Sequence, residues 1–161
     1  IILNDVKETA EHYTIVDLIR NDLSMVSQRV RVERFRYFDT IGTNEKRLLQ
    51  VSSEICGEME EGYLSAIGDI IFSLLPEGSV SGAPKKKTTE IIASAEGIPR
   101  GYYTGIAGLF DGRNLNSGVL IRFIEKRDNG YFYRSGGGIT SFSEPLSEYN
   151  EMIDKIYVPV I

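Results

Sequence analysis

The stretch Leu75–Glu90, LPEGSVSGAPKKKTTE, decides how the middle of the chain folds. Its glycines and serines predict a loop, and Pro84 lies where the first turn of a helix tolerates proline. A helix is then predicted over Lys85–Glu96, and Gly97 closes it as a C-terminal glycine does. Before the loop, Tyr63–Leu75 repeats apolar residues at helical intervals and ends at a proline. We therefore predict two helices joined by a Gly/Ser-rich loop.

The rest of the chain predicts further helices and antiparallel strands. Apolar spacing indicates a helix over Asp5–Val26, and strand-like runs cover Arg29–Asp39 and Leu48–Gly57. The last third contains three strand-like runs, two turns and a helix, in this order: Tyr102–Phe110, the turn Asp111–Asn116, Gly118–Glu125, the turn Arg127–Gly130, Gly130–Gly136 and Glu144–Ile156. This layout predicts the α+β class, an antiparallel β core with packed helices, within one domain.

Composition and charge exclude several classes of function. The 161 residues carry a net charge of −5, with Lys and Arg scattered among the acids, so we expect no nucleic-acid surface. No apolar run approaches the ~20 residues of a membrane helix. Cys56 is the single cysteine and is interpreted as a buried or half-buried thiol, which fits a reducing compartment. We expect a cytoplasmic protein without nucleic-acid or membrane partners, whose natural start is not residue 1.

Two acidic pairs predict a metal site. Glu8 and Glu11, and likewise Glu148 and Glu151, are three residues apart, which places each pair on one face of a helix. Like charges at this spacing repel, and a divalent cation between the two helices would reverse that cost. Oxygen ligands around a largely hydrated ion suit Mg²⁺. Backbone N–H groups of the Gly/Ser-rich loop can bind an anion, so we expect a substrate with carboxylates. The alternative is two solvated helix faces.

Six blocks of sequence, in order from end to end of the chain, resemble the chorismate-binding enzyme family. They are KETAEHYTIVDLIRNDL, PEGSVSGAPKKKTTEII, YYTGIAGLFDG, GVLIRF, RSGGGIT and SEYNEMIDK. The resemblance implies that residues 1–161 are the C-terminal part of that family's single catalytic domain, with the N-terminal part missing. The family fold, as in anthranilate synthase component I, is a two-sheet antiparallel β core wrapped by helices, which agrees with the predicted class.

Finer details are most similar to the aminodeoxychorismate synthase component I branch of the family: LLQVSSEICGEM, FDGRNLNSGVLIRFIE and EMIDKIYVPV. The implied reaction is Mg²⁺-dependent amination of chorismate to 4-amino-4-deoxychorismate, for p-aminobenzoate and folate synthesis, with ammonia from a glutamine amidotransferase partner. Alternatives in the family are anthranilate synthesis and isochorismate or salicylate synthesis. An alternative of another class is a non-catalytic metal- and carboxylate-binding fragment. A nucleophilic lysine in a P-I-K-G-T motif and a general-acid glutamate are expected before Ile1, so we expect this chain alone to lack turnover.

The resemblance assigns the metal to the four glutamates. Glu11 and Glu151 would bind Mg²⁺ directly, and Glu8 and Glu148 would act largely through bound water. The cation would neutralise the ring carboxylate of chorismate and serve as a template. His12, the neighbour of Glu11, is expected to pack the helix rather than to act as a base.

The resemblance also assigns backbone and hydroxyl contacts. The N–H groups of Gly136, Gly137 and Gly138 would donate to a substrate carboxylate, because glycine lets a ligand approach the backbone closely. Ser79 would hydrogen-bond a substrate oxygen or hold its loop. Gln50 stands where the family often has histidine near the leaving hydroxyl, and glutamine cannot shuttle a proton near neutral pH. Ser79 and Gln50 are the catalytic candidates.

Three further side chains are expected to meet the carboxylates of the substrate. Arg122, which ends the predicted strand GVLIR, would pair with the enolpyruvyl carboxylate together with Tyr103, since a guanidinium binds a carboxylate in a bidentate way. Lys155 would be another carboxylate partner, and the alternative is a helix-stabilising pair with Glu151. Lys85 lies near a helix N-terminus, where a cation gains nothing from the helix dipole, which indicates ligand or packing contacts.

Overall fold

The computed structural model describes residues 6–42 and 47–157. It divides into two compact units, Ile1–Pro99 and Arg100–Ile161, here called unit 1 and unit 2. Among the strands that the structure describes, every pairing is antiparallel, and helices accompany the strands in both units. The α+β class is therefore confirmed. The expectation that both units belong to one catalytic domain stays a prediction.

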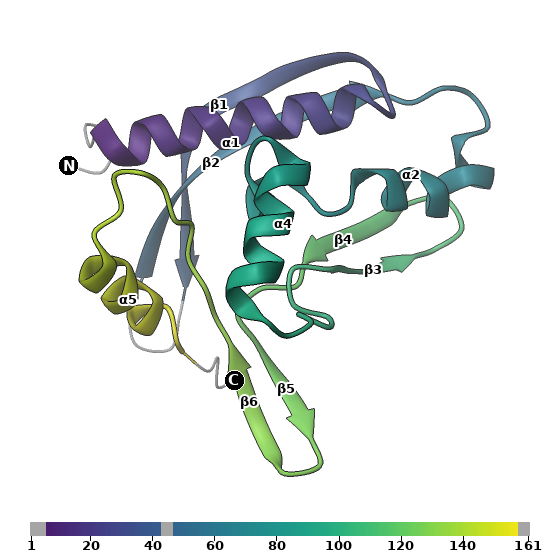
Figure 1. The fold of residues 1–161 in the computed structure, drawn as a ribbon. Coiled ribbons are helices and arrows are strands. Elements are labelled where there is room, and N and C mark those ends of the chain that lie inside the picture. Colours follow the sequence, from purple (N-terminus) through teal and green to yellow (C-terminus); the bar gives the residue numbers. More distant parts are fainter. Residues whose placement is uncertain (1–5, 43–46, 158–161) are drawn as a thin grey trace. The chain divides into compact units, whose positions relative to one another are not determined.

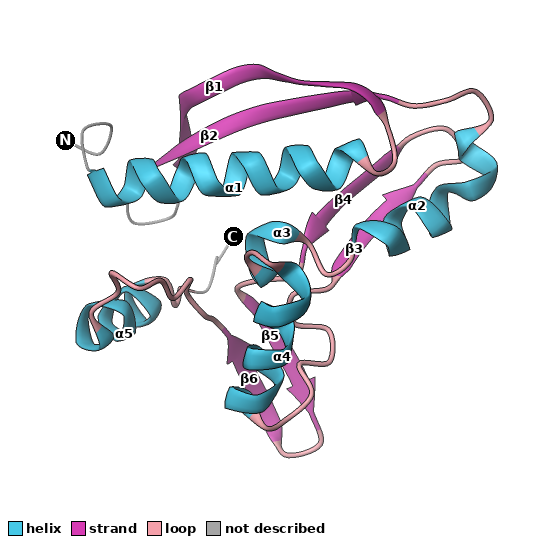
Figure 2. Ribbon diagram, turned by 45° about the horizontal axis from the view of Figure 1, so that its top comes forward, coloured by secondary structure: helices cyan, strands magenta, loops and turns pink. Residues whose placement is uncertain are grey.

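Unit 1 is built from one long ribbon and several helices. Helix α1 lies along the ribbon formed by β1 and β2 (Figure 1). Arg29 and Arg36 have positive φ values of 49° and 46° at irregularities in the pairing of β1. Irregularities of this kind increase the local twist, and the ribbon curves along α1 in Figure 2. The elements are α1 (Val6–Ser24), β1 (Gln28–Gly42), β2 (Arg47–Glu58), the 3₁₀ turn η2 (Tyr63–Ala66), α2 (Ile67–Leu74), α3 (Gly78–Ser81) and α4 (Lys85–Glu96).

Helix α1 is attached to the ribbon by a polar contact and by ring contacts with Phe35. The side chain of Val16 is buried. His12 Nε2 lies 2.7 Å from Ser53 Oγ, which also accepts the backbone N–H of Arg36 at 3.0 Å. The edge of the His12 ring faces Phe35, with 5.8 Å between centroids. Burial, and then the charge of Arg36, lower the pKa of His12 because both disfavour the imidazolium. The predicted packing role of His12 is confirmed.

Most helices of unit 1 follow the sequence prediction, although α1 ends at Ser24 rather than Val26 and the predicted helix Tyr63–Leu75 begins as the 3₁₀ turn η2. Helix α4 has the predicted bounds Lys85–Glu96, and Gly97 caps it with a φ of 65° and an N–H donated to the carbonyl of Ala93 at 3.1 Å. Asp5, the expected first residue of α1, lies outside the described residues. The prediction of a plain loop between α2 and α4 is wrong, because Gly78–Ser81 forms one helical turn, α3.

Unit 2 consists of two hairpins and a helix (Figure 2). In the first hairpin Ile106 pairs with Val119, and in the second Phe123 pairs with Arg134. No helix in the described part of either unit is long and apolar enough to cross a membrane. The elements of unit 2 are β3 (Ile106–Phe110), β4 (Leu115–Val119), β5 (Phe123–Arg127), β6 (Gly130–Arg134) and α5 (Pro145–Asp154).

Two strand predictions in unit 2 are wrong in their bounds. The run Gly118–Glu125 is not one strand, because the chain bends between β4 and β5, where Arg122 has a φ of 53°. Arg122 therefore does not end a strand. The run Tyr102–Phe110 becomes a strand at Ile106, because the preceding residues form a turn in which Thr104 has a φ of 66°. Apolar residues continue through the corner at Arg122, so their pattern conceals that bend, whereas Gly101 and Gly105 flank the turn at Thr104.

The first hairpin turn is also tighter than predicted. Its carboxylate Asp111 accepts the N–H groups of Arg113 at 2.8 Å and Asn114 at 2.6 Å, while Leu115 and Asn116 already pair within the hairpin. These hydrogen bonds, chiefly those from Asn114 and Arg113, hold the pKa of Asp111 below its usual value. The turn is thus closed by its own aspartate, as is common for this residue type.

Candidate functional site

The buried side chains among the described residues are mostly polar. Asp22 and Ser81 in unit 1 and Glu148 in unit 2 are 8%, 6% and 8% exposed, whereas Val16 is the buried apolar residue. A buried polar or charged group is tolerated when hydrogen bonds or an opposite charge compensate for lost water. These three side chains are therefore the places in each unit where compensating polar contacts are expected.

Segment 77–85 of unit 1 surrounds one buried carboxylate of α1. Asp22 Oδ2 accepts the N–H of Gly78 at 2.9 Å, and Oδ1 accepts a hydrogen bond from Lys85 Nζ at 2.7 Å. The ammonium also lies 3.4 Å from the carbonyl of Leu74. A Cβ on Gly78 would lie 2.9 Å from Leu18 Cβ, so glycine is needed for this close approach. We call the set Asp22, Gly78 and Lys85 the Asp22 clamp.

Several N–H groups of this segment donate within unit 1. Val80 and Ser81 donate to the carbonyl of Glu77 at 3.2 and 3.1 Å, and Gly82 donates to the carbonyl of Gly78 at 2.8 Å. With the N–H of Gly78 directed at α1, four donors of the segment have partners in the protein. The segment therefore presents less of an open anion site than its glycines and serines predicted, and its side chains become the groups that can meet a ligand.

The two catalytic candidates, Ser79 and Gln50, lie on exposed surface of unit 1. Ser79 Oγ donates to Glu77 Oε2 at 2.7 Å, which leaves the hydroxyl oxygen as an acceptor. Gln50 lies on β2, where Asp39 of β1 is its pairing partner. Among the described contacts none joins Ser79 to Gln50. Their catalytic assignments stay predictions.

Unit 2 brings several predicted site residues together around the glycine segment 136–138. A Cβ on Gly136 would overlap Tyr103 Oη, and a Cβ on Gly137 would lie 4.0 Å from Glu148 Oε2. A Cβ on Gly138 would meet nothing within 4 Å. Tyr103, the glycine backbone and the buried carboxylate of Glu148 are thus neighbours, although Tyr103 and Glu148 lie far apart in the chain. This grouping combines a hydroxyl, an accessible backbone and an acid.

Helix α5 follows the glycine segment in the chain and carries Glu148 and Glu151, with Lys155 as its C-terminal cap. Glu144 caps it by accepting the N–H groups of Leu146 and Ser147, each at 3.1 Å. One turn from the helix end, Glu151 Oε1 accepts a hydrogen bond from Lys155 Nζ. The helix-stabilising pair that was the alternative for Lys155 is therefore present, and its substrate role stays a prediction.

The four glutamates fit Mg²⁺ by their chemistry. Glu8 and Glu11 lie on α1 of unit 1, and Glu148 and Glu151 lie on α5 of unit 2. Carboxylate oxygens are the hard ligands that Mg²⁺ prefers, and the ion needs only one or two of them beside water and substrate oxygens. Glu148 adds the observation of a carboxylate held at a buried position. In the described residues no three His, Cys, Asp or Glu side chains form a ready-made cluster, so the fit rests on the pairs.

The comparison with known proteins covers almost the whole chain. The family model for chorismate binding enzymes matches residues 1–160. The chain belongs to the chorismate-binding enzyme family. An uncharacterized PabA-like protein of Haemophilus influenzae is 54% identical over 99% of this chain and is matched over 48% of its own length. The chain thus spans about half the length of this curated relative.

Chorismate-binding enzymes of several activities are similar to this chain. Aminodeoxychorismate synthase component 1 of Bacillus subtilis is 36% identical over 97% of the chain and 33% of its own length. Anthranilate synthase component 1 of Aquifex aeolicus is 37% identical over 96% of the chain and 31% of its own length. A solved structure from Bacillus anthracis, described as a 2,3-dihydroxybenzoate-specific isochorismate synthase, has a TM-score of 0.77 and 25% identity over 95% of this chain and 40% of its own. The family resemblance and the partial chorismate-binding fold are confirmed.

One polar residue of this family member was not singled out from the sequence. Asp22 follows Leu18 by four residues and so lies on the same side of α1, where an acid is unexpected. The unfavourable place of Lys85 at a helix start was the available signal, and the ion pair explains it. The predicted packing contact of Lys85 is therefore observed. Arg122 is exposed at the bend after β4, and its role in binding stays a prediction.

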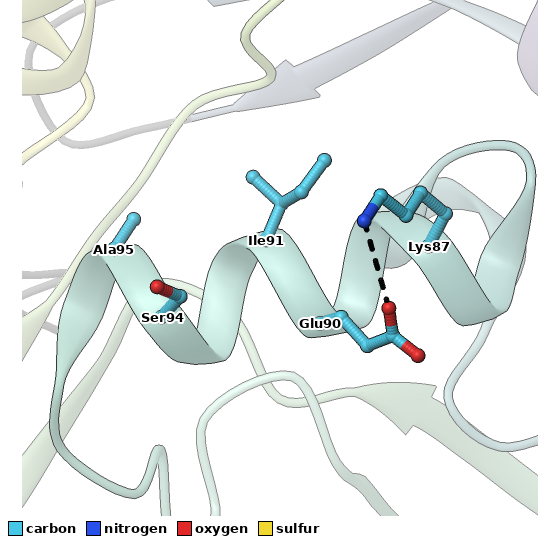
Figure 3. Close-up of a pocket in the computed structure, with 5 residues that line it drawn as sticks. All are labelled: Lys87, Glu90, Ile91, Ser94 and Ala95. Carbon is cyan, nitrogen blue, oxygen red and sulfur yellow. Dashed lines mark ion pairs between the residues drawn. The ribbon is translucent and has the colours of Figure 1, made fainter.

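One side of α4 carries a shallow depression of its own. Five residues on one side of the helix line a shallow depression: Lys87, Glu90, Ile91, Ser94 and Ala95 (Figure 3). The ion pair between Lys87 and Glu90 is 3.8 Å long and exposed. None of the predicted metal, substrate or catalytic residues lines this depression. Lys87 and Glu90 therefore serve as control positions for experiments on the site.

Proposed function

We propose that this chain is the C-terminal part of the catalytic domain of an aminodeoxychorismate synthase component I. The reaction replaces the 4-hydroxyl of chorismate by an amino group, with ammonia from a glutamine amidotransferase partner and release of water, in the cytoplasm. The observation that carries the proposal is the grouping of Tyr103, Gly136, Gly137 and Glu148 in unit 2. It supports a site where a substrate carboxylate approaches backbone N–H groups next to an acid that can face a cation.

The residues of this chain bind and orient chorismate. The planar guanidinium of Arg122 and the hydroxyl of Tyr103 hold the enolpyruvyl carboxylate, because a charge-assisted pair fixes both distance and direction. Lys155 leaves its helix pair with Glu151 to meet a carboxylate. The backbone of Gly138, where a Cβ would meet open space, is the accessible part of the glycine segment. Orientation of this kind lowers the barrier by fixing the reacting groups in place.

In this proposal the two glutamate pairs would hold Mg²⁺. When bound, the ion neutralises the ring carboxylate and acts as a template rather than as a source of hydroxide. Glu11 and Glu151 would be its direct ligands, and Glu8 and Glu148 would act largely through bound water. The buried position of Glu148 supports this role, since a carboxylate kept from solvent is oriented before the ion arrives. Gln50 contacts the substrate near the departing hydroxyl, and Ser79 hydrogen-bonds a substrate oxygen or holds its loop.

The test is to identify the product. The whole protein is incubated with chorismate, ammonium and Mg²⁺, and the products are separated and weighed by mass spectrometry. We expect 4-amino-4-deoxychorismate, and we expect residues 1–161 alone to form none. Glu151→Gln should remove turnover, whereas Glu90→Gln on the open face of α4 should keep it. Absence of chorismate conversion by the whole protein would refute the proposal.

Anthranilate synthesis is the second candidate. It is favoured by the similarity to anthranilate synthase component 1. That relative is 37% identical to this chain, and the aminodeoxychorismate synthase relative is 36% identical. The two reactions differ in product, because anthranilate formation also releases the enolpyruvyl group as pyruvate. Pyruvate release in the same assay, together with alanine in place of lysine in the P-I-x-G-T motif of the whole protein, would select this candidate.

A further inference from the structure

We propose that Asp22 is a positioning residue, which fixes segment 77–85 for chorismate binding and uses Lys85 as its counter-ion. The proposal rests on the proposed function, because binding of chorismate is its readout. Asp22 itself does not touch substrate in this proposal. It acts through the segment that carries Ser79.

The first argument is that one carboxylate joins both ends of the segment. Gly78 and Lys85 are 56 and 63 residues from Asp22 in the chain, yet each contacts a different oxygen of its carboxylate. Between them, the N–H of Gly82 returns to the carbonyl of Gly78 at 2.8 Å. The segment is therefore closed internally by α3 and fastened externally at both ends. Ser79 lies inside this closed path.

The second argument concerns the free energy of a buried ion pair. The side chains of Asp22 and Lys85 are 12% and 29% exposed. A buried pair often contributes no more stability than apolar residues of similar volume would, because both charges lose water. What the pair contributes is a defined geometry. A carboxylate with two directed partners allows one arrangement, whereas apolar contacts allow several. A clamp of this kind fits a segment whose position matters.

The third argument links the clamp to the metal candidates. Helix α1 is continuous over Val6–Ser24, so Glu8, Glu11 and Asp22 belong to one rigid element. Fastening segment 77–85 to Asp22 therefore places Ser79 in the same frame as the two glutamates. A change at Asp22 would alter the distance between the hydroxyl and those carboxylates without touching either.

Paired substitutions separate positioning from stability. In the whole protein, Asp22→Asn alone leaves the Lys85 ammonium without its carboxylate, and we expect the melting temperature to fall by about 5 °C. Asp22→Asn combined with Lys85→Met removes both charges, so the melting temperature should recover. The KM for chorismate should stay raised about fivefold, with kcat little changed, because ground-state binding is what the segment provides. Asp17→Asn and Lys87→Met, at exposed ion pairs, are the matched controls and should change neither quantity.

Two outcomes overturn the proposal. If KM returns to the wild-type value together with the melting temperature in the double variant, Asp22 is a structural residue only. Amide hydrogen exchange tests the proposal without substrate. The N–H groups of Val80, Ser81 and Gly82 should exchange about tenfold faster in the double variant. Unchanged exchange there contradicts a positioning role. If the wild-type protein makes no product from chorismate, the proposed function fails, and the exchange result still decides whether Asp22 fixes the segment.

Discussion

Segment 77–85 of unit 1 and segment 136–138 of unit 2 are held in opposite ways. The first is held by polar contacts, since the buried carboxylate of Asp22 binds Gly78 and Lys85. The second is shaped by a missing side chain, since Gly136 leaves room for the hydroxyl of Tyr103. The first arrangement should therefore fail when a group is removed, with a loss of stability. The second should fail when a group is added, with a misplaced side chain and little loss of stability.

Removing the carboxylate of the clamp should have the largest effect. Asp22→Ala leaves the N–H of Gly78 and the ammonium of Lys85 without their acceptor, so the free energy of unfolding should fall by about 3 kcal/mol. The exposed Asp17→Ala on the same helix should cost less than about 0.5 kcal/mol. Urea denaturation of the whole protein measures both. Equal losses in the two variants would contradict a special role for the buried pair.

Adding a methyl group to the glycine segment should affect binding more than stability. Gly136→Ala displaces the hydroxyl of Tyr103, and we expect KM for chorismate to rise about tenfold, which corresponds to about 1.4 kcal/mol. Gly118→Ala on β4, where a Cβ meets nothing within 4 Å, is the control for strand substitution. Gly138→Ala sharpens the comparison, because its Cβ clashes with no protein atom. A raised KM there would identify close approach of the ligand itself.

The cap of α5 consists of polar contacts on exposed surface. Its loss should therefore lower the free energy of unfolding less than loss of the buried Asp22 clamp. Glu144→Ala removes the acceptor for Leu146 and Ser147, and we expect a loss of about 1 kcal/mol in the free energy of unfolding. Glu144→Gln keeps an oxygen acceptor and should lose less. If Glu144→Ala lost as much free energy of unfolding as Asp22→Ala, the expected difference between buried and exposed polar contacts would be contradicted.

Acid should weaken unit 1 through His12, with the smallest effect of the four. Its pKa is lowered in the fold, so the unfolded chain binds the proton more readily. The stability that neutral His12 provides is present above its ordinary pKa of about 6.5 and is lost as pH falls through that value and the lower folded one. Melting temperatures between about pH 7.5 and pH 5 should show this slope. His12→Gln should flatten it, and an unchanged slope would assign the effect to other groups.

Local signals predicted much of the fold. Apolar periodicity identified α1. The proline before α4 and the glycine after it identified that helix together with its bounds. One failure occurred where the backbone turns without a glycine or proline to show it. Arg122 adopts a positive φ value within apolar, β-branched sequence, and no residue type there announces the bend.

The candidate site was less accessible to sequence reasoning, because its contacts join distant residues. The pairing of Asp22 with Lys85 and the approach of Gly136 to Tyr103 depend on how elements pack, which a single sequence does not state. Tyr103, the glycines and Glu148 were nevertheless selected in advance from the family resemblance. The metal, substrate and catalytic roles of all the selected residues stay predictions.

The Asp22 clamp also makes two parts of the sequence interdependent in evolution. Asp22 belongs to the block KETAEHYTIVDLIRNDL, whereas Gly78 and Lys85 belong to PEGSVSGAPKKKTTEII. A lineage that lost the acid would keep an uncompensated ammonium, and one that lost the lysine would keep an uncompensated acid. We therefore expect positions 22 and 85 to covary. A chimera that takes one of these blocks from a relative with a different pair would inherit half of a contact.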